Sequence, residues 1–370
     1  GWKDGRRRLL VQYVDDFAIA GSKDDIEEIM EAIKEEFVID ERGQLDGGMI
    51  LGMEVKRDRV RKTITLTQRR YADDVLERFG LSIAKPARTP MDEHKQLAIS
   101  EGSTSEDMRG ADKSMYLQAV GSLMYLMVCT RPDLAYAVGV VSRFSHDPKA
   151  IHWAAIKRIL RYVAGTRSHG LTLGGHPDSP LVEVWTDSDY AGDHETRRST
   201  TGFAIKVYGS TVVWVSRRQK AISRSSHESE YVALSQACQN VVWVSKLLQQ
   251  IGYIVDDPIP VHVDNQGAIE TTKNGNHSER TKHIDVAYKY GRELHQSGTI
   301  SLRYCPTDSM LADILTKPLG WEKLERFRGG LGVGLGSGHE DRKGSALVAA
   351  SGSVGNCGGG AVRAPRGAPD

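Results

Sequence analysis

The sequence has little that would suit a zinc-binding, secreted or membrane-spanning protein. Its four cysteines are scattered, with no CxxC pair and no histidines at a zinc-site spacing, which favours a reducing, intracellular setting. The longest apolar stretch, near residues 119–129, is about half of the roughly 20 residues that a bilayer span requires. We therefore expect a buried helix there and no membrane partner. The formal charge is only +1, so any contact with nucleic acid must come from local patches.

Both ends of the sequence have a biased composition. Arginines precede an apolar run at the start, as in a signal peptide, but Asp15 and Asp16 interrupt that run. The chain does not begin with Met, which is what a start inside a longer protein would give. Beyond Gly329 the sequence is rich in glycine, alanine and serine, so we expect residues 321–370 to form a disordered tail.

Hydrophobic periodicity divides the remaining chain into three parts. Residues 1–90 alternate strand patterns with helical ones, and two short apolar runs flank Asp15 and Asp16 as a hairpin with acids at its tip. Residues 91–178 combine a polar linker with helical segments that carry a basic outer face. Residues 179–320 read as three strands, a long helix, a strand, helices, a strand and a final helix from Ser309. That order predicts an α/β fold, a mixed sheet with helices packed on it.

Two aspartates follow strand patterns in this third part. Asp187 and Asp264 each close a run of β-branched residues, and ligands of open sheets bind beyond the carboxyl ends of parallel strands. Taken singly, either residue also fits a turn or an N-cap, especially Asp264, which precedes Asn265. Asp313 stands in an apolar helical turn where an acid facing solvent is equally plausible.

The long helix offers two acids, and helical phase separates them. Steps of three and four residues from Glu230 reach only apolar positions, so Glu230 lies on the buried stripe. The same steps from Glu228 reach a mixed face, and Glu228 follows Ser225 by three residues, the spacing of a capping box. A carboxylate on a core-facing stripe is costly unless it is paired or binds a metal. We therefore assign capping to Glu228 and function to Glu230, with a core salt bridge as the alternative.

The segments that contain these acids resemble one family in register. WTDSDYAGD, RRSTTGFAI, SRSSHESEYVAL, VDNQGAIE, TKHIDVAY and MLADILTKPL occur in the order found in the ribonuclease H (RNase H) domain of copia-type LTR retrotransposon Pol polyproteins. The resemblance covers residues 181–319. It implies an RNase H-like fold in which two Mg²⁺ or Mn²⁺ ions are held for cleavage of RNA in an RNA/DNA hybrid. The ligands that it implies are Asp187, Glu230, Asp264 and Asp313.

The same resemblance suggests roles for residues around the acids. His283 in TKHIDV would assist proton transfer or product release, although it also fits a packing or capping residue at a helix start. A cluster of cations before the long helix would grip phosphates, or would form a solvated loop: Arg217, Arg218, Lys220 and Arg224.

The first part of the chain resembles the reverse transcriptase of the same polyproteins. Tyr13, Val14, Asp15 and Asp16 match its YVDD signature, followed by LGMEV, GSLMYL, TRPDLAYAVGVVSRF and HWAAIKRILRYVAGT. This implies a palm remnant followed by a helical thumb or connection region. A polymerase site needs a further carboxylate from an earlier strand, so we expect Asp15 and Asp16 not to polymerise by themselves.

Three functions remain open on the sequence. The first is a hybrid-cutting nuclease within a polyprotein, located in a cytoplasmic virus-like particle or the nucleus, with the remainder of the polyprotein as a partner. The second is a degenerate or domesticated remnant that binds nucleic acid without catalysis. The third is a recombination-type nuclease on the same fold, acting on DNA.

Overall fold

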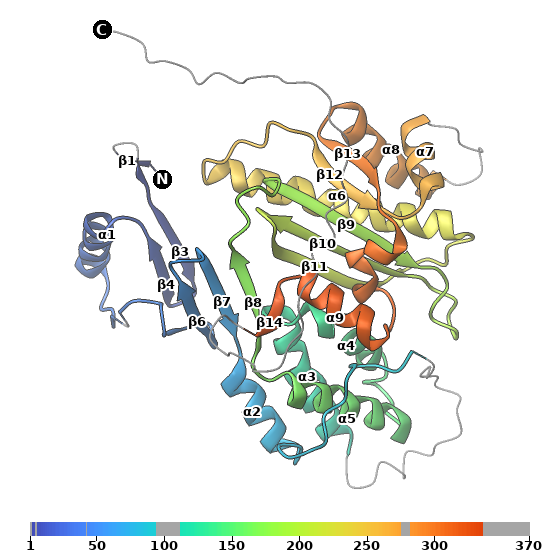
Figure 1. Cartoon of the computed structure of the whole chain (residues 1–370), viewed down its shortest axis with the longest axis horizontal. Helices are drawn as coiled ribbons and strands as arrows, with labels where there is room; N and C mark the ends of the chain where they lie inside the picture. The colour runs from blue at the N-terminus through green and yellow to red at the C-terminus, as the bar shows by residue number, and fades with distance from the viewer. Residues whose placement is uncertain (1, 4–5, 42, 94–111, 275–281, 336–370) are drawn as a thin grey trace. The chain divides into compact units, whose positions relative to one another are not determined.

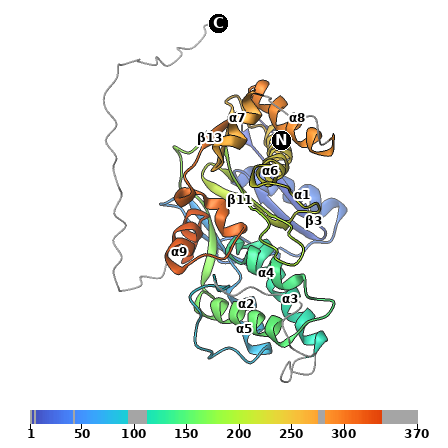
Figure 2. The same ribbon diagram turned by 90° about the vertical axis from the view of Figure 1, so that its right-hand side faces the viewer.

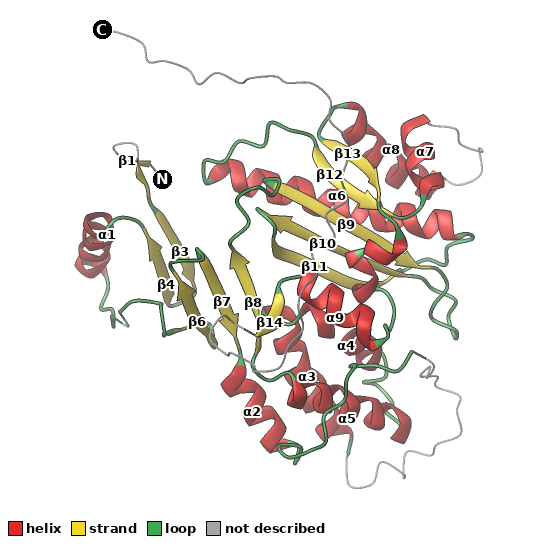
Figure 3. Cartoon of the chain, in the orientation of Figure 1, coloured by secondary structure: helices red, strands yellow, loops and turns green. Residues whose placement is uncertain are grey.

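A computed structural model describes residues 2–3, 6–41, 43–93, 112–274 and 282–335, and only the backbone at 2–3, 6–7, 274 and 282–288. Most of the predicted tail, residues 336–370, and much of the predicted linker lie outside these ranges. Figure 1 follows the chain from end to end, and Figure 3 separates its helices from its strands. No helix within the described ranges is long and apolar enough to cross a bilayer.

The predicted mixed sheet is present, in the order β11-β10-β9-β12-β13 (Figure 1). Its first three strands form an antiparallel meander, and its last two run parallel to β9. The bounds are β9 Val182–Asp189, β10 Thr200–Val207, β11 Ser210–Arg218, β12 Ile259–Val263 and β13 Ile300–Tyr304. β9 continues two residues past Asp187, so this acid lies inside the strand and not at its end as predicted.

One face of this sheet packs against α6 (Ser226–Gln250), and α7 (Gln266–Asn274) and α8 (Lys282–Gln296) complete the helical layer. Alternate strand residues such as Val184 and Ile205 are fully buried against it. The apolar stripe predicted by stepping from Glu230 is confirmed, since every position on it is buried: Leu234, Ala237, Val241, Val244 and Leu248.

Short turns and the helical region cover part of the opposite face. The predicted final helix from Ser309 is two 3₁₀ turns, η3 (Thr307–Ser309) and η4 (Leu311–Leu315). Ala204 of β10 and Ile314 of η4 share a hydrophobic core with the helices of the second part of the chain. Those helices are α3 Lys113–Cys129, η2 Pro132–Leu134, α4 Ala135–Ser142 and α5 Ala150–Gly165. Figure 2 shows them from a second side. The predicted helical region therefore shares a core with the mixed sheet.

A second, fully antiparallel sheet combines segments that are distant in sequence, in the order β14-β8-β7-β6-β5. Its strands are β5 Met49–Ile50, β6 Met53–Asp58, β7 Thr63–Thr67, β8 His169–Gly174 and β14 Val333–Leu335. The predicted hairpin is confirmed as β3 (Leu9–Tyr13) and β4 (Asp16–Ala20). The remaining elements are β1 Trp2–Lys3, β2 Arg6–Arg7, α1 Lys23–Glu36 and α2 Arg69–Arg78.

The structure moves the start of the predicted tail. Residues 321–335, placed in the tail by composition, form α9 (Trp321–Gly330) and β14. Leu324 and Phe327 of α9 are buried in the helical core, and Val333 pairs with Leu171 of β8. A glycine count misses these contacts, because only a few apolar side chains are needed when a preformed core and a strand edge are available.

A buried polar network joins α9 to the helical region. Arg131 forms a bidentate ion pair with Asp133, at 2.9 Å (Nε–Oδ1) and 2.7 Å (Nη2–Oδ2). The Tyr162 hydroxyl donates to Asp133 Oδ2 at 2.7 Å and accepts from Arg328 Nη1 at 3.2 Å. Full satisfaction of this kind makes a buried charge pair tolerable. The TRPD part of the reverse-transcriptase-like motif thus builds the core here.

Candidate active site

Asp187 lies on β9 directly opposite Gly202 of β10. A Cβ atom at Gly202 would lie 2.5 Å from Thr316 Cγ2, 2.9 Å from Leu315 Cβ and 3.1 Å from the Ala312 carbonyl oxygen. Only glycine leaves room for the η4 segment to approach the sheet so closely. This approach lets the Thr316 hydroxyl donate a hydrogen bond to Asp187 Oδ2.

Glu230 reaches the same end of β9 from the second turn of α6. Its Oε1 accepts hydrogen bonds from the backbone N–H of Ser188 at 3.2 Å and from the Ser188 hydroxyl at 2.9 Å. Its Oε2 is buried and has no hydrogen-bond partner. An unsatisfied carboxylate oxygen in the interior is costly, so this atom points to a missing cationic partner.

The assignment of Glu228 to capping is confirmed, with one change in its partner. Ser225 is the N-cap of α6, and its hydroxyl accepts from the Glu228 backbone N–H at 3.1 Å. The Glu228 carboxylate accepts from the backbone N–H of Arg224, at 2.8 Å, in place of the N-cap N–H that a capping box would use.

Asp264 immediately follows β12, as predicted. The N-cap role that the sequence left open for it belongs to its neighbour, because the Asn265 side chain accepts from the Ala268 backbone N–H at 2.9 Å. Asp264 Oδ2 accepts a hydrogen bond from the Thr307 hydroxyl at 3.3 Å.

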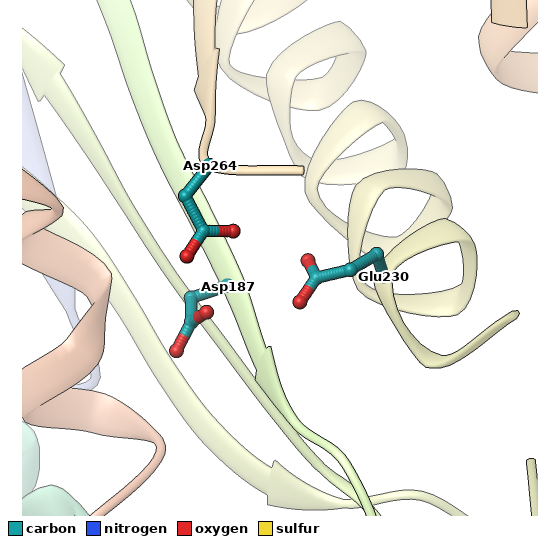
Figure 4. Close-up of side chains that lie close together, drawn as sticks. All are labelled: Asp187, Glu230 and Asp264. Carbon is teal, nitrogen blue, oxygen red and sulfur yellow. The ribbon is translucent and has the colours of Figure 1, made fainter. Parts of the chain in front are cut away.

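These elements bring three of the four predicted acids together. Carboxylate oxygens of Asp187, Glu230 and Asp264 all lie within 4.8 Å of one another. Figure 4 shows the three side chains directed toward a common space, Asp187 from β9, Glu230 from α6 and Asp264 from the turn after β12. Among the residues that the structure describes, these three acids form the group that could hold a metal ion. Oxygen ligands at this spacing suit a hard divalent cation.

Burial and mutual repulsion raise the pKa of all three acids, and Lys317 offsets only part of this effect at Asp187 and Asp264. Burial, offset by Lys317 and reinforced by Asp313, raises the pKa of Asp187 to about 7. Burial also raises the pKa of Glu230 well above its ordinary value, and the charges of Asp187 and Asp264 add to the effect. The pKa of Asp264 is raised for the same two reasons, burial and a neighbouring carboxylate. A cation bound between the three carboxylates would favour their charged forms and so lower all three pKa values.

Asp313, the fourth predicted acid, is completely buried and lies beside the trio without joining it. The alternative of a solvent-facing acid is therefore wrong. Its carboxylate pairs with two lysines, Lys317 at 2.9 Å and Lys323 at 2.7 Å. Lys317 also lies 3.9 Å from Asp187 Oδ2, so it connects Asp313 to the trio.

The predicted phosphate-binding cations differ in their surroundings, and the predicted helper His283 can be placed only by its backbone. Arg218 pairs with Asp193, whereas Arg217, Lys220 and Arg224 are exposed. His283 lies in the first turn of α8, and its side chain is outside the described residues.

Asp15 and Asp16 lie at the turn of the β3–β4 hairpin, with Asp16 as the first residue of β4. The three-acid grouping found within the described ranges does not include them. The expectation that Asp15 and Asp16 do not polymerise by themselves stays a prediction.

The predictions did not include Lys317 and Lys323, although one signal for Lys317 was available. It follows Asp313 by four residues, the spacing at which opposite charges meet across a helical turn. Lys323 belongs to α9, inside the supposed tail, so no local pattern pointed to it. Ser188, which holds Glu230, could only be found from the packing of α6 on β9.

A five-stranded sheet of this order, with carboxylates gathered where β9, α6 and β12 meet, defines an RNase H-like domain. No protein-family model matches the chain. The sequence is 39% identical over 319 residues to the retrovirus-related Pol polyprotein from transposon TNT 1-94 of Nicotiana tabacum, covering 86% of this chain and 24% of the relative. It is 35% identical to the corresponding polyprotein from transposon RE2 of Arabidopsis thaliana, covering 88% and 22%. The chain belongs to the copia-type retrovirus-related Pol polyproteins.

Two further matches complete the comparison. The chain covers 94% of the uncharacterized mitochondrial protein AtMg00810 of Arabidopsis thaliana, at 35% identity and 64% of this chain. The crystal structure of LC11-RNase H1 in complex with RNA/DNA hybrid matches 36% of this chain and 93% of that chain, with 17% identity and a TM-score of 0.28. The chain spans under a quarter of the length of the two Pol polyproteins.

Proposed function

We propose that the RNase H-like part of this chain cleaves the RNA strand of RNA/DNA hybrids with the help of divalent metal ions. The observation that carries this proposal is the convergence of Asp187, Glu230 and Asp264 within 4.8 Å. Membership of the Pol polyprotein family supports it, because the motifs that carry the family resemblance are the ones that contain these acids.

The residues fit Mg²⁺ or Mn²⁺. Three hard oxygen donors face one space, and the buried Oε2 atom of Glu230 has no other partner. Ser188 fixes the second carboxylate oxygen of Glu230 and Thr316 fixes one of Asp187, so both side chains are oriented before an ion arrives. Bound ions would activate a water molecule and stabilise charge on the leaving 3′ oxygen. The resemblance implies two ions and adds Asp313 to their ligands.

Exposed cations near the N-terminus of α6 would hold the substrate. Arg217, Lys220 and Arg224 precede the helix that carries Glu230, and their charges face solvent. Phosphate contacts by such residues position a duplex without reading its sequence. Arg218 contributes less to this grip, because Asp193 already neutralises it. His283 stays a proposed helper for proton transfer or product release.

A cleavage assay with labelled RNA in a hybrid tests the proposal. We expect Mg²⁺- or Mn²⁺-dependent cutting that is lost in Asp264→Asn, which keeps the shape but removes the charge. Asp257→Asn, a change at an exposed acid before β12, is the matched control and should cut normally. Undiminished cutting by Asp264→Asn would show that the site is assigned wrongly.

The same assay separates the alternatives. Salt-dependent hybrid binding without metal-dependent turnover would identify a non-catalytic remnant. Cleavage of DNA junctions or duplexes in preference to hybrids would identify a recombination-type nuclease. We propose no polymerase activity from this chain alone, because a polymerase site needs a further carboxylate from a strand earlier than the hairpin that carries Asp15 and Asp16.

A further inference from the structure

The side of the site next to Asp313 is already filled by positive charge. Lys323 Nζ lies 2.7 Å from Asp313 Oδ2, and Lys317 Nζ lies 2.9 Å from Asp313 Oδ1. Both oxygens of this carboxylate therefore lie within ion-pair distance of an ammonium group, and the contact of Oδ2 with Lys323 also has hydrogen-bond geometry, whereas that of Oδ1 with Lys317 does not. The arrangement is enclosed, since Asp313 is fully buried and the two lysine side chains are only 32% and 26% exposed.

Lys317 occupies the space between Asp313 and the three-acid group. Its Nζ atom is 3.9 Å from Asp187 Oδ2 and 2.9 Å from Asp313 Oδ1. Asp189, two residues along β9, also attracts it electrostatically. An ion bridging Asp187 and Asp313 would have to displace this ammonium group.

The other side of the site is open by comparison. Glu230 Oε2 has no hydrogen-bond partner, and Glu230 lies with Asp187 and Asp264 in the group that could hold one ion. The two halves differ in their side chains: two lysines lie against Asp313, whereas the group of Asp187, Glu230 and Asp264 has only Lys317 near it, 3.9 Å from Asp187 Oδ2. Three carboxylates, those of Asp187, Asp189 and Asp313, act electrostatically on the Lys317 ammonium group.

We propose that Lys317 is a built-in cation that takes the place of a second metal ion, so that the site binds a single divalent ion at Asp187, Glu230 and Asp264. This inference rests on the proposed metal-dependent function and changes its ion count. Asp313, with Lys323 behind it, is then a positioning residue that holds Lys317 in place. An ammonium group supplies three N–H donors and a fixed positive charge, which suit it to phosphate oxygens.

The number of bound ions tests this proposal directly. The full chain is titrated with Mn²⁺, and free ion is counted by electron paramagnetic resonance. We expect one bound Mn²⁺ for the unaltered chain and two for Lys317→Met, which keeps the length of the side chain but removes the charge. Lys317→Arg keeps the charge and should again bind one. Lys246→Met, at an exposed lysine of α6, is the matched control and should also bind one.

Other counts would overturn the proposal in distinguishable ways. Two ions on the unaltered chain would show that a second ion displaces the Lys317 ammonium group, and would leave the proposed nuclease function intact. One ion on a folded Lys317→Met, verified by its thermal melt, would show that the lysine does not set the count. Zero ions on the unaltered chain would remove both this inference and the metal-dependent function. The count on the unaltered chain can still refute the proposal where a variant fails to fold, because two ions or none would each overturn it.

Discussion

Gly202 offers the most direct test of how the site is assembled. A Cβ atom added there would lie 2.5 Å from Thr316 Cγ2 and 2.9 Å from Leu315 Cβ, both closer than real carbon atoms approach. The third neighbour, at 3.1 Å, is the Ala312 carbonyl oxygen, a backbone atom that cannot rotate away. Gly202→Ala must therefore push η4 from the sheet. Overpacking of this kind costs about 1–3 kcal/mol.

The displacement would affect one half of the site more than the other. Thr316, Lys317 and Asp313 move with η4, whereas Glu230 and Asp264 are held by α6 and β12. We expect Gly202→Ala to lower the free energy of unfolding in urea, followed by tryptophan fluorescence, and to reduce hybrid cleavage under conditions where the protein is still folded.

A matched glycine provides the control. Gly121, exposed in the middle of α3, has no atom within 4 Å of its added Cβ. Gly121→Ala should stabilise the chain by about 0.5–1 kcal/mol, because alanine is the better helix former. If Gly202→Ala were as stable and as active as the unaltered chain, the close approach of η4 to β10 would not be what positions Asp313 and Lys317.

Two further predictions concern buried polar groups. Tyr162→Phe removes the hydroxyl that donates to Asp133 and accepts from Arg328, so we expect the free energy of unfolding in urea to fall by about 1–3 kcal/mol. The control is Tyr208→Phe, at a tyrosine that is 42% exposed, which should change this free energy little. Equal effects of the two changes would contradict the network. Asp187→Asn tests the raised pKa of about 7: because the folded-state pKa lies above the unfolded value, the contribution of the Asp187 carboxyl to stability is fully present below its unfolded pKa and is lost as the pH rises through about 7. In chelator, thermal melts should show Asp187→Asn to be more stable than the unaltered chain at pH 8, with the gap closing as the pH falls. A gap independent of pH would exclude this titration.

Local patterns were sufficient for most elements and for part of the site. The stripe from Glu230 to Leu248 identified the buried face of α6, and helical phase distinguished Glu230 from Glu228, because an α-helix repeats every 3.6 residues whatever surrounds it. The strands of the mixed sheet were found from β-branched runs in the same way. β8 was missed, since its glycines and threonine resemble a loop until β7 and β14 flank it.

The sequence by itself determined the order of the acids, the family and the strand and helix sequence of the RNase H-like part. Only the tertiary structure decided which acids meet. Asp187, Glu230 and Asp264 come together because β12 pairs parallel to β9 while α6 packs across β9, and such long-range pairing leaves no local signal. The burial and ion pairing of Asp313 likewise depend on residues that are distant in the sequence. Gly202 leaves room for η4 to approach the sheet, and α9, which was predicted to belong to the tail, supplies Lys323. Charge pairing of this kind depends on position in space, which no periodicity along the chain records.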